Sequence, residues 1–221
     1  MPEDRLVDRM GRVGVFSGGV EERAPPEAGN LMSSAIDARA VTETASSTKE
    51  LRNLYYVRFV FAVIWAVLIM LTASTLNPAG IALLVIYPLF DVAAAVIDFR
   101  SSGTTRPRAP LYLNMALSLL TAIGLAVAVT SGIPSVLRVW GAWAITAGIV
   151  QLIVAILRYR LGGQWAMILS GGISVIAGSS FILMAGGPKA SVSGISGYAV
   201  LGGIFFLISA IRLHRLAVKA N

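Results

Sequence analysis

Six long apolar stretches dominate the chain after residue 53 and constrain its fold more than any other feature. Each is close to the roughly 20 residues with which an α-helix crosses the hydrocarbon core of a bilayer. Only 13% of the 221 residues are charged, whereas soluble domains carry about 25%. The sequence therefore predicts an all-α, polytopic membrane protein with six transmembrane helices. The expected spans are approximately Leu54–Leu76, Ile81–Phe99, Leu111–Thr130, Val136–Leu157, Trp165–Ala185 and Ile195–Ile211.

Basic residues gather on one side of these spans. Two of them, Arg138 and Lys189, fall on the other side. The positive-inside rule therefore places both termini in the cytoplasm and the protein in the cytoplasmic (inner) membrane. The same charges predict contact with the lipid bilayer and with anionic lipids at its cytoplasmic face. Because nearly all of the excess basic residues flank the spans, no nucleic acid partner is expected. The basic residues on the cytoplasmic side are Lys49, Arg52, Arg58, Arg100, Arg106, Arg108, Arg158, Arg160, Arg212, Arg215 and Lys219.

The ends of the chain differ in composition from the spans. Residues 1–46 mix Gly, Pro, Ser, Glu and Arg without a sustained apolar period, which predicts a disordered cytoplasmic tail. Ser47 and Glu50 have the spacing of a capping box, so we expect a helix to begin there and to run into the first span. The membrane domain is then expected over residues 47–215 and a cytoplasmic C-terminal tail over residues 216–221. Met32 offers an alternative start that would omit the first 31 residues.

The spans read as three repeated helical hairpins, at about residues 54–99, 111–157 and 165–211. Small residues three or four positions apart recur along them, and such residues let helix backbones approach closely in lipid. We interpret them as helix-packing residues, with a glycine-lined substrate path as the alternative. The tryptophans, which mostly fall near span ends, are interpreted as interfacial or packing residues. The predicted helix-packing residues are Gly124, Gly148, Ser170, Ser174, Gly178 and Gly203.

Asp91 is the residue best suited to chemistry inside the membrane. It and Asp98 are the only carboxylate side chains after Glu50. Asp91 lies about 13 Å inside the end of its span, at about 1.5 Å per residue. A bare carboxylate at such a depth costs about 2.5–3.5 kcal/mol, so it should be paired, protonated or in contact with water. Arg58 is the expected partner. The pair either fixes the register of two helices or forms a proton- or ion-responsive site.

The repeat register extends this pair to the other hairpins. Position 58 corresponds to Asn114 and Ile168, and position 91 corresponds to Gln151 and Phe206. We therefore expect each hairpin to close through its equivalent pair of side chains. The candidate intramembrane polar network comprises Arg58, Asp91, Asp98, Asn114 and Gln151.

Catalysis, metal binding and cofactor binding have little support in the sequence. The chain has no cysteine and a single histidine, His214, which lies beyond the last span. A Ser–His pair therefore cannot be assembled among the spans, and two aspartates without a second histidine provide no metal cage. No catalytic, metal-binding or cofactor-binding residue is expected, and the protein is predicted not to be an enzyme.

Three short segments carry a resemblance to a known family. They read GAWAITAGIVQ from Gly141, RYRLGGQW from Arg158 and GGISVIAG from Gly171. Together with the three hairpins and the Arg-rich ends, they make the chain resemble the HdeD-type membrane proteins over about residues 56–215. The first repeat departs from the family pattern, because Phe59 and Pro88 stand where glycines are usual. The resemblance implies a multi-pass cytoplasmic-membrane protein of largely unassigned activity, with one relative linked to acid resistance.

Two functions follow as expectations. The first is a non-enzymatic envelope protein with a role in acid or general stress response, which acts through packing or partner binding. Its protein contact would be a homo-oligomer or another membrane protein. The alternative is a small proton- or ion-conducting channel or transporter in which Asp91 works together with Arg58.

Overall fold

The computed structural model describes residues 26–72, 75–101, 108–157, 159–161, 164–188 and 190–220, and these are helical apart from short connections. Six of the helices are long and apolar enough to cross a membrane. The prediction of an all-α, multi-pass membrane protein is therefore confirmed. The helices are α1 (Pro26–Thr72), α2 (Pro78–Ser101), α3 (Arg108–Ala128), α4 (Ile133–Leu157), α5 (Trp165–Ala185) and α6 (Ser193–Ala220), with the short 3₁₀-helices η1 (Val129–Ser131) and η2 (Tyr159–Leu161).

Helix α1 begins much earlier than the first span. It starts at Pro26, so the prediction of a disordered tail over residues 1–46 is wrong for residues 26–46, and residues 1–25 lie outside the described part. Proline is favoured in the first turn of a helix, which is where Pro26 lies. Ser47 and Glu50 consequently lie inside α1 and do not begin a helix. Residues 26–41 belong to a different compact unit from Thr42–Asn221, and the second unit holds the six spans.

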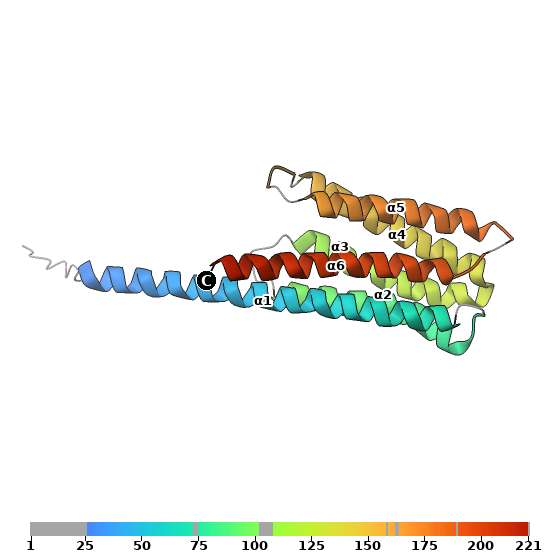
Figure 1. Ribbon diagram of the computed structural model, residues 1–221, viewed down its shortest axis with the longest axis horizontal. Coiled ribbons are helices and arrows are strands. Elements are labelled where there is room, and N and C mark those ends of the chain that lie inside the picture. The colour runs from blue at the N-terminus through green and yellow to red at the C-terminus, as the bar shows by residue number, and fades with distance from the viewer. Residues whose placement is uncertain are drawn as a thin grey trace, which may run out of the picture. The chain divides into compact units, whose positions relative to one another are not determined.

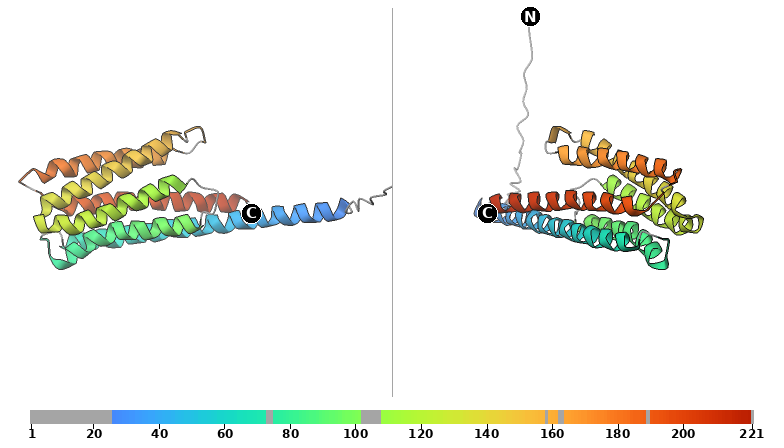
Figure 2. Two further views of the ribbon diagram at one scale, coloured as in Figure 1. Left: turned by 180° about the vertical axis from the view of Figure 1, so that it is seen from behind. Right: turned by 45° about the vertical axis from the view of Figure 1, so that its right-hand side comes forward.

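Within Thr42–Asn221 the six helices form a bundle that closes on itself (Figure 1). Trp65 of α1 donates a hydrogen bond from Nε1 to the Leu83 carbonyl of α2, at 2.7 Å. Gly203 of α6 lies against Ala62 of α1, because a Cβ on this glycine would be 3.1 Å from the Ala62 Cβ. Helix α2 packs extensively on α3, and α4 on α5. Helices α5 and α6 share few contacts and separate toward the end of the bundle near the C-terminus (Figure 2).

Four glycines hold α4 against α5 at backbone contact distance. A Cβ on Gly141 would lie 2.6 Å from the Gly178 carbonyl oxygen, and a Cβ on Gly178 would lie 2.6 Å from that of Gly141. The pair Gly148 and Gly171 repeats this reciprocal contact at 2.7 and 2.9 Å. Any larger residue would force the two helices apart, which is the reason for small residues at helix contacts in lipid.

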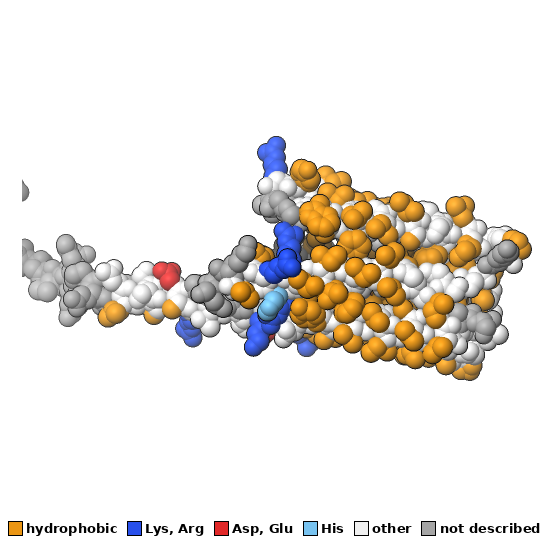
Figure 3. Space-filling view, in the orientation of Figure 1, with side chains coloured by type: hydrophobic (Ala, Val, Ile, Leu, Met, Phe, Trp, Pro, Cys, Tyr) orange, Lys and Arg blue, Asp and Glu red, His pale blue; other side chains and the backbone are white. Residues whose placement is uncertain are grey.

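The two ends of the bundle differ in charge. Exposed basic side chains gather at one end of the apolar block, and we call it the arginine-rich end (Figure 3). Arg138 is exposed at the beginning of α4, toward the other end. The described basic residues of the arginine-rich end are Lys49, Arg52, Arg100, Arg160, Arg212 and Arg215.

The hydrophobic core fills the half of the bundle farther from the arginine-rich end, and we call it the packed half. Trp65 and Trp140 stack at its centre, with ring centroids 5.5 Å apart and exposures of 1% and 0%. Tyr87 packs against both indole rings. The tryptophans therefore divide, since Trp65 and Trp140 are core residues whereas Trp165 is exposed. The other large core side chains come from all six helices and include Ile69, Leu84, Leu125, Leu137, Phe181 and Ile195.

Candidate binding cavity

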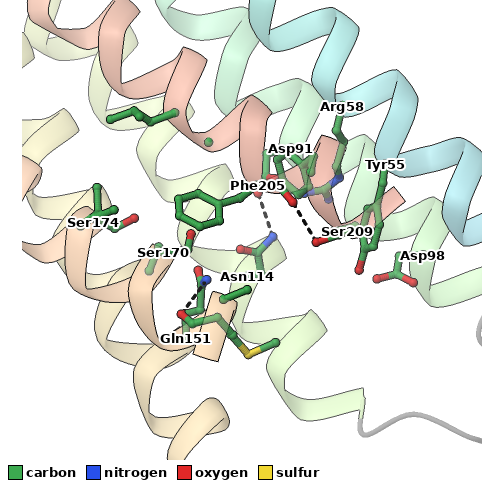
Figure 4. Close-up of a pocket in the computed structure, with 18 of the residues that line it drawn as sticks. Tyr55, Arg58, Asp91, Asp98, Asn114, Gln151, Ser170, Ser174, Phe205 and Ser209 are labelled. Carbon is green, nitrogen blue, oxygen red and sulfur yellow. Dashed lines mark hydrogen bonds and ion pairs between the residues drawn. The ribbon is translucent and has the colours of Figure 1, made fainter. Parts of the chain in front are cut away.

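The half of the bundle at the arginine-rich end holds a cavity of about 690 Å³ (Figure 4). This volume lies within the range of about 300–1,000 Å³ that is usual for small-molecule sites. All six helices contribute to the lining, and its charged side chains are two cations and two anions, namely Arg58, Arg212, Asp91 and Asp98. Tyr87, Trp143 and Tyr198 line the cavity where the packed half begins.

Asp91 lies at the centre of a hydrogen-bond network that joins three helices. Its Oδ1 accepts a hydrogen bond from Nη1 of Arg58 on α1, at 3.0 Å. Its Oδ2 accepts from Nδ2 of Asn114 at 2.8 Å and from Oγ of Ser118 at 2.7 Å, both on α3. An ionised carboxylate inside a bilayer requires such partners. The predicted pairing of Arg58 with Asp91 is present in the structure.

Arg58 joins this network to α6. Its guanidinium carbon lies 5.0 Å from the centroid of the Phe206 ring, which is within cation–π distance. The side chain is 13% exposed, and its Nε has no hydrogen-bond partner among the described residues. The guanidinium group of Arg58 is thus held between Asp91 and Phe206, and the residue also lines the cavity.

The equivalent pair of the second hairpin does not form. Asn114 turns to Asp91 on α2, and Gln151 donates from Nε2 to the Met167 carbonyl of α5, at 3.2 Å. The expectation that each hairpin closes through its own pair is therefore wrong for Asn114 and Gln151. The physical reason is that a charged carboxylate is a stronger acceptor than an amide oxygen, so the Asn114 amide satisfies Asp91 first.

The remaining predicted polar residues also line the cavity. Gln151 lies on its α4 wall, and Asp98 lies on α2, closer than Asp91 to the arginine-rich end. All five residues of the predicted network therefore surround one space, in which Arg58 and Asn114 both bond to Asp91.

The predicted packing residues mostly lie at helix contacts. Gly124 faces Val139 of α4, Gly148 and Gly178 belong to the α4–α5 contact, and Gly203 faces α1. Ser174 lies against Gly148, and its hydroxyl accepts a hydrogen bond from the Tyr198 hydroxyl at 3.1 Å. Ser170 and Ser174 both line the cavity.

Several residues of the cavity escaped the sequence analysis. Ser118 follows Asn114 by one helical turn, so a polar pair at this spacing on α3 was the available signal. Tyr87, Trp143 and Tyr198 carried no such signal, because aromatic residues near span ends are usual in membrane helices. Their position at the inner end of the cavity depends on how α2, α4 and α6 meet.

The geometry allows binding from one side of the membrane. The cavity reaches Asp91 from the arginine-rich end, and the core of the packed half fills the bundle beyond it. Trp143 lines the inner end with a buried Nε1 that has no hydrogen-bond partner in the described part of the chain. The described residues contain no group of three side chains that could hold a metal ion.

Comparisons with known proteins give no indication of the function. They do not bear on the resemblance to HdeD-type proteins, which stays a prediction of the sequence. No protein-family model, curated protein or solved structure matches the chain.

Proposed function

We propose that the protein is a small, non-enzymatic membrane carrier that binds its solute in the cavity. The observation that carries this proposal is the cavity of about 690 Å³, polar at its centre and bounded by the packed half. The positive-inside rule supports a cytoplasmic position for the arginine-rich end, so the solute would enter on the cytoplasmic side of the membrane. An open channel is less well supported, since Trp65, Trp140 and their neighbours fill the bundle beyond the cavity.

The ion pair gives this carrier its recognition site. Arg58 and Asp91 are close, oppositely charged and only 13% and 17% exposed. A proton or a cation can compete with Arg58 for Asp91, and an anion can compete with Asp91 for Arg58. Either event would loosen the contact between α1 and α2, and the energetic consequence is large because the surroundings have a low dielectric constant.

Flux of protons and small ions into liposomes tests the carrier. We would compare the wild type with Asp91→Asn and with the double variant Arg58→Met/Asp91→Leu. Removing one member of a buried ion pair costs about 3–5 kcal/mol, whereas replacing both by apolar residues of similar volume is often close to neutral. The double variant therefore separates loss of function from loss of folding.

Wild-type flux above that of empty liposomes, with no flux through a folded double variant, is the expected result. Flux that persists in the double variant would show that the protein conducts ions without the Arg58–Asp91 ion pair. Wild-type flux equal to that of empty liposomes, for protons and for each ion tested, would contradict the carrier for these solutes.

A second function is supported by the hydrogen bonds of Asp91. The carboxylate accepts three of them, from two neighbouring helices, as a structural clamp would. This arrangement favours the HdeD-like alternative, in which the protein contributes to acid or envelope stress through packing or partner binding. In that case the double variant should protect cells at low pH as well as the wild type does.

A further inference from the structure

The cavity has a side wall that the helices themselves leave open. On α5 the residues Met167, Ser170 and Ile173 line the cavity, and on α6 the residues Leu201, Gly202 and Phe205 do so. We call these two facing rows the α5–α6 seam. Both rows are incompletely buried, and Leu201 is 45% exposed.

Contacts between α5 and α6 concentrate in the packed half. Phe181 and Tyr198 meet there edge to face, with centroids 5.9 Å apart, and Gly194 lies against Phe181 and Met184. The hydrogen bond from Tyr198 to Ser174 comes next toward the arginine-rich end. Beyond it the helices diverge, as Figure 1 shows. A Cβ on Gly202 would meet no atom within 4 Å. The seam therefore connects the cavity with the lipid-facing surface of the bundle.

The arginine side chains that line the cavity favour a ligand that accepts hydrogen bonds. Both carboxylate oxygens of Asp91 already accept hydrogen bonds, whereas the guanidinium group of Arg58 lies over the Phe206 ring on the wall of the cavity. Arg212 also lines the cavity and is exposed at the arginine-rich end. Arginine guanidinium groups suit a phosphate or carboxylate.

We propose that the α5–α6 seam is a lateral entrance from the leaflet at the arginine-rich end, and that it admits an amphiphile with an anionic headgroup. The headgroup lies in the cavity beside Arg58, and the acyl chain lies in the seam against Met167 and Leu201. This inference rests on the proposed carrier function and names the class of its substrate. A second copy of the chain is a poorer occupant, since it would bring the same basic end to the same leaflet.

Native mass spectrometry of the detergent-purified protein tests the seam. The probes are palmitoyl-oleoyl phosphatidylglycerol, the phosphatidylcholine with the same chains, and glycerol 3-phosphate, which carries the phosphate without an acyl chain. Gly202→Trp fills the seam, where the structure leaves room for a side chain. Gly197→Trp is the matched control, because Gly197 lies on the same helix, has equal room and does not line the cavity. A thermal melt of each variant checks its folding.

The wild type and Gly197→Trp should retain one phosphatidylglycerol, in preference to phosphatidylcholine, and Gly202→Trp should bind it about tenfold or more weakly. Equal retention by all three proteins, or by none, would overturn the lateral entrance. Glycerol 3-phosphate binding as tightly as the lipid would identify a soluble anion as the ligand. Dimers that Gly202→Trp abolishes would identify a second copy as the occupant, and either result would refute the amphiphile.

The liposome assay on the same proteins separates this inference from the carrier. Proton or ion flux without lipid retention would refute the amphiphile and leave the carrier. The protein could instead retain lipid at the seam but show neither ion flux nor transfer of a chain-labelled phosphatidylglycerol between leaflets. That result would support the binding site and refute the carrier.

Discussion

The same six helices form two halves of opposite character. In the packed half, large aromatic and aliphatic side chains from every helix meet, and Trp65, Trp140 and Leu137 are almost inaccessible. In the half at the arginine-rich end, the helices surround a cavity lined by charged and polar side chains. Van der Waals contact is the main force between helices in lipid, so the bundle closes where its side chains interlock. The other half tolerates a buried carboxylate because Asp91 accepts three hydrogen bonds there, from Arg58, Asn114 and Ser118.

A second contrast concerns the two neighbours of α5. Toward α4, the glycines Gly141, Gly148, Gly171 and Gly178 bring the backbones into contact. Toward α6, Phe181 and Tyr198 meet in the packed half, and the facing rows nearer the arginine-rich end line the cavity. Helix α5 therefore packs mainly against α4. Its packing against α6 is the least extensive between the long helices whose contacts are described.

Truncation of the core should give the largest effect on this comparison. Trp140→Ala removes a completely buried ring that stacks on Trp65 and contacts Tyr87. We expect a loss of about 3–5 kcal/mol in the free energy of unfolding. Denaturant unfolding in mixed micelles, followed by circular dichroism, measures it. Trp165→Ala is the control, because Trp165 is 61% exposed and should change the stability little. Equal losses of unfolding free energy in both variants would contradict the conclusion that the packed half holds the core.

Separation of α4 from α5 should give the next largest effect. Gly178→Val places a side chain against the Gly141 carbonyl and the Ile145 backbone nitrogen, so the helices must move apart. Overpacking of this kind costs about 1–3 kcal/mol. Gly172→Val, on the same helix, meets no atom within 4 Å at its Cβ and serves as the control. The midpoint of thermal unfolding should fall in Gly178→Val and stay near the wild-type value in Gly172→Val. The reverse order would show that α5 is not held through its glycines.

Thiol labelling should sharpen the comparison with the least disturbance of the fold. The chain has no cysteine, so each introduced thiol is the one that reacts. Ser170→Cys lies on the cavity wall, whereas Ser196→Cys lies in the packed half, where Ser196 is 5% exposed. A membrane-impermeant methanethiosulfonate should modify the first in lipid nanodiscs while the second stays unmodified, since the reactive thiolate requires water. Modification of both at similar rates would mean that the packed half is open to water.

Much of the fold could be predicted from the sequence. The prediction for α5 was correct at both ends, and the other five spans were recognised within a few residues on most sides. The pairing of Arg58 with Asp91 was predictable as well, because an isolated carboxylate in hydrocarbon demands a partner. The helical part of the tail from Pro26 was missed, since its mixture of small, polar and charged residues without an apolar face resembles that of a disordered segment.

The candidate site was predictable as a set of residues and not as an arrangement. Arg58, Asp91, Asp98, Asn114 and Gln151 all line the cavity. Which of them bond to each other was predicted wrongly for Asn114 and Gln151, because repeat register says nothing about competition between acceptors. Three further residues were identified only from the packing of three helices. Ser118 of α3 bonds to Asp91, and Tyr87 of α2 and Trp143 of α4 line the inner end of the cavity.

The sequence by itself determined the class of the protein, its spans and the need to neutralise Asp91. These follow from hydropathy and from the cost of charge in hydrocarbon, which are properties of single segments and residues. The tertiary structure decided that one half is packed and the other open, that α5 joins α4, and that the polar side chains meet in one cavity. Those features depend on which helix faces meet and how closely their backbones approach. Helix–helix contact in lipid is therefore a property of pairs of surfaces, which no single span contains.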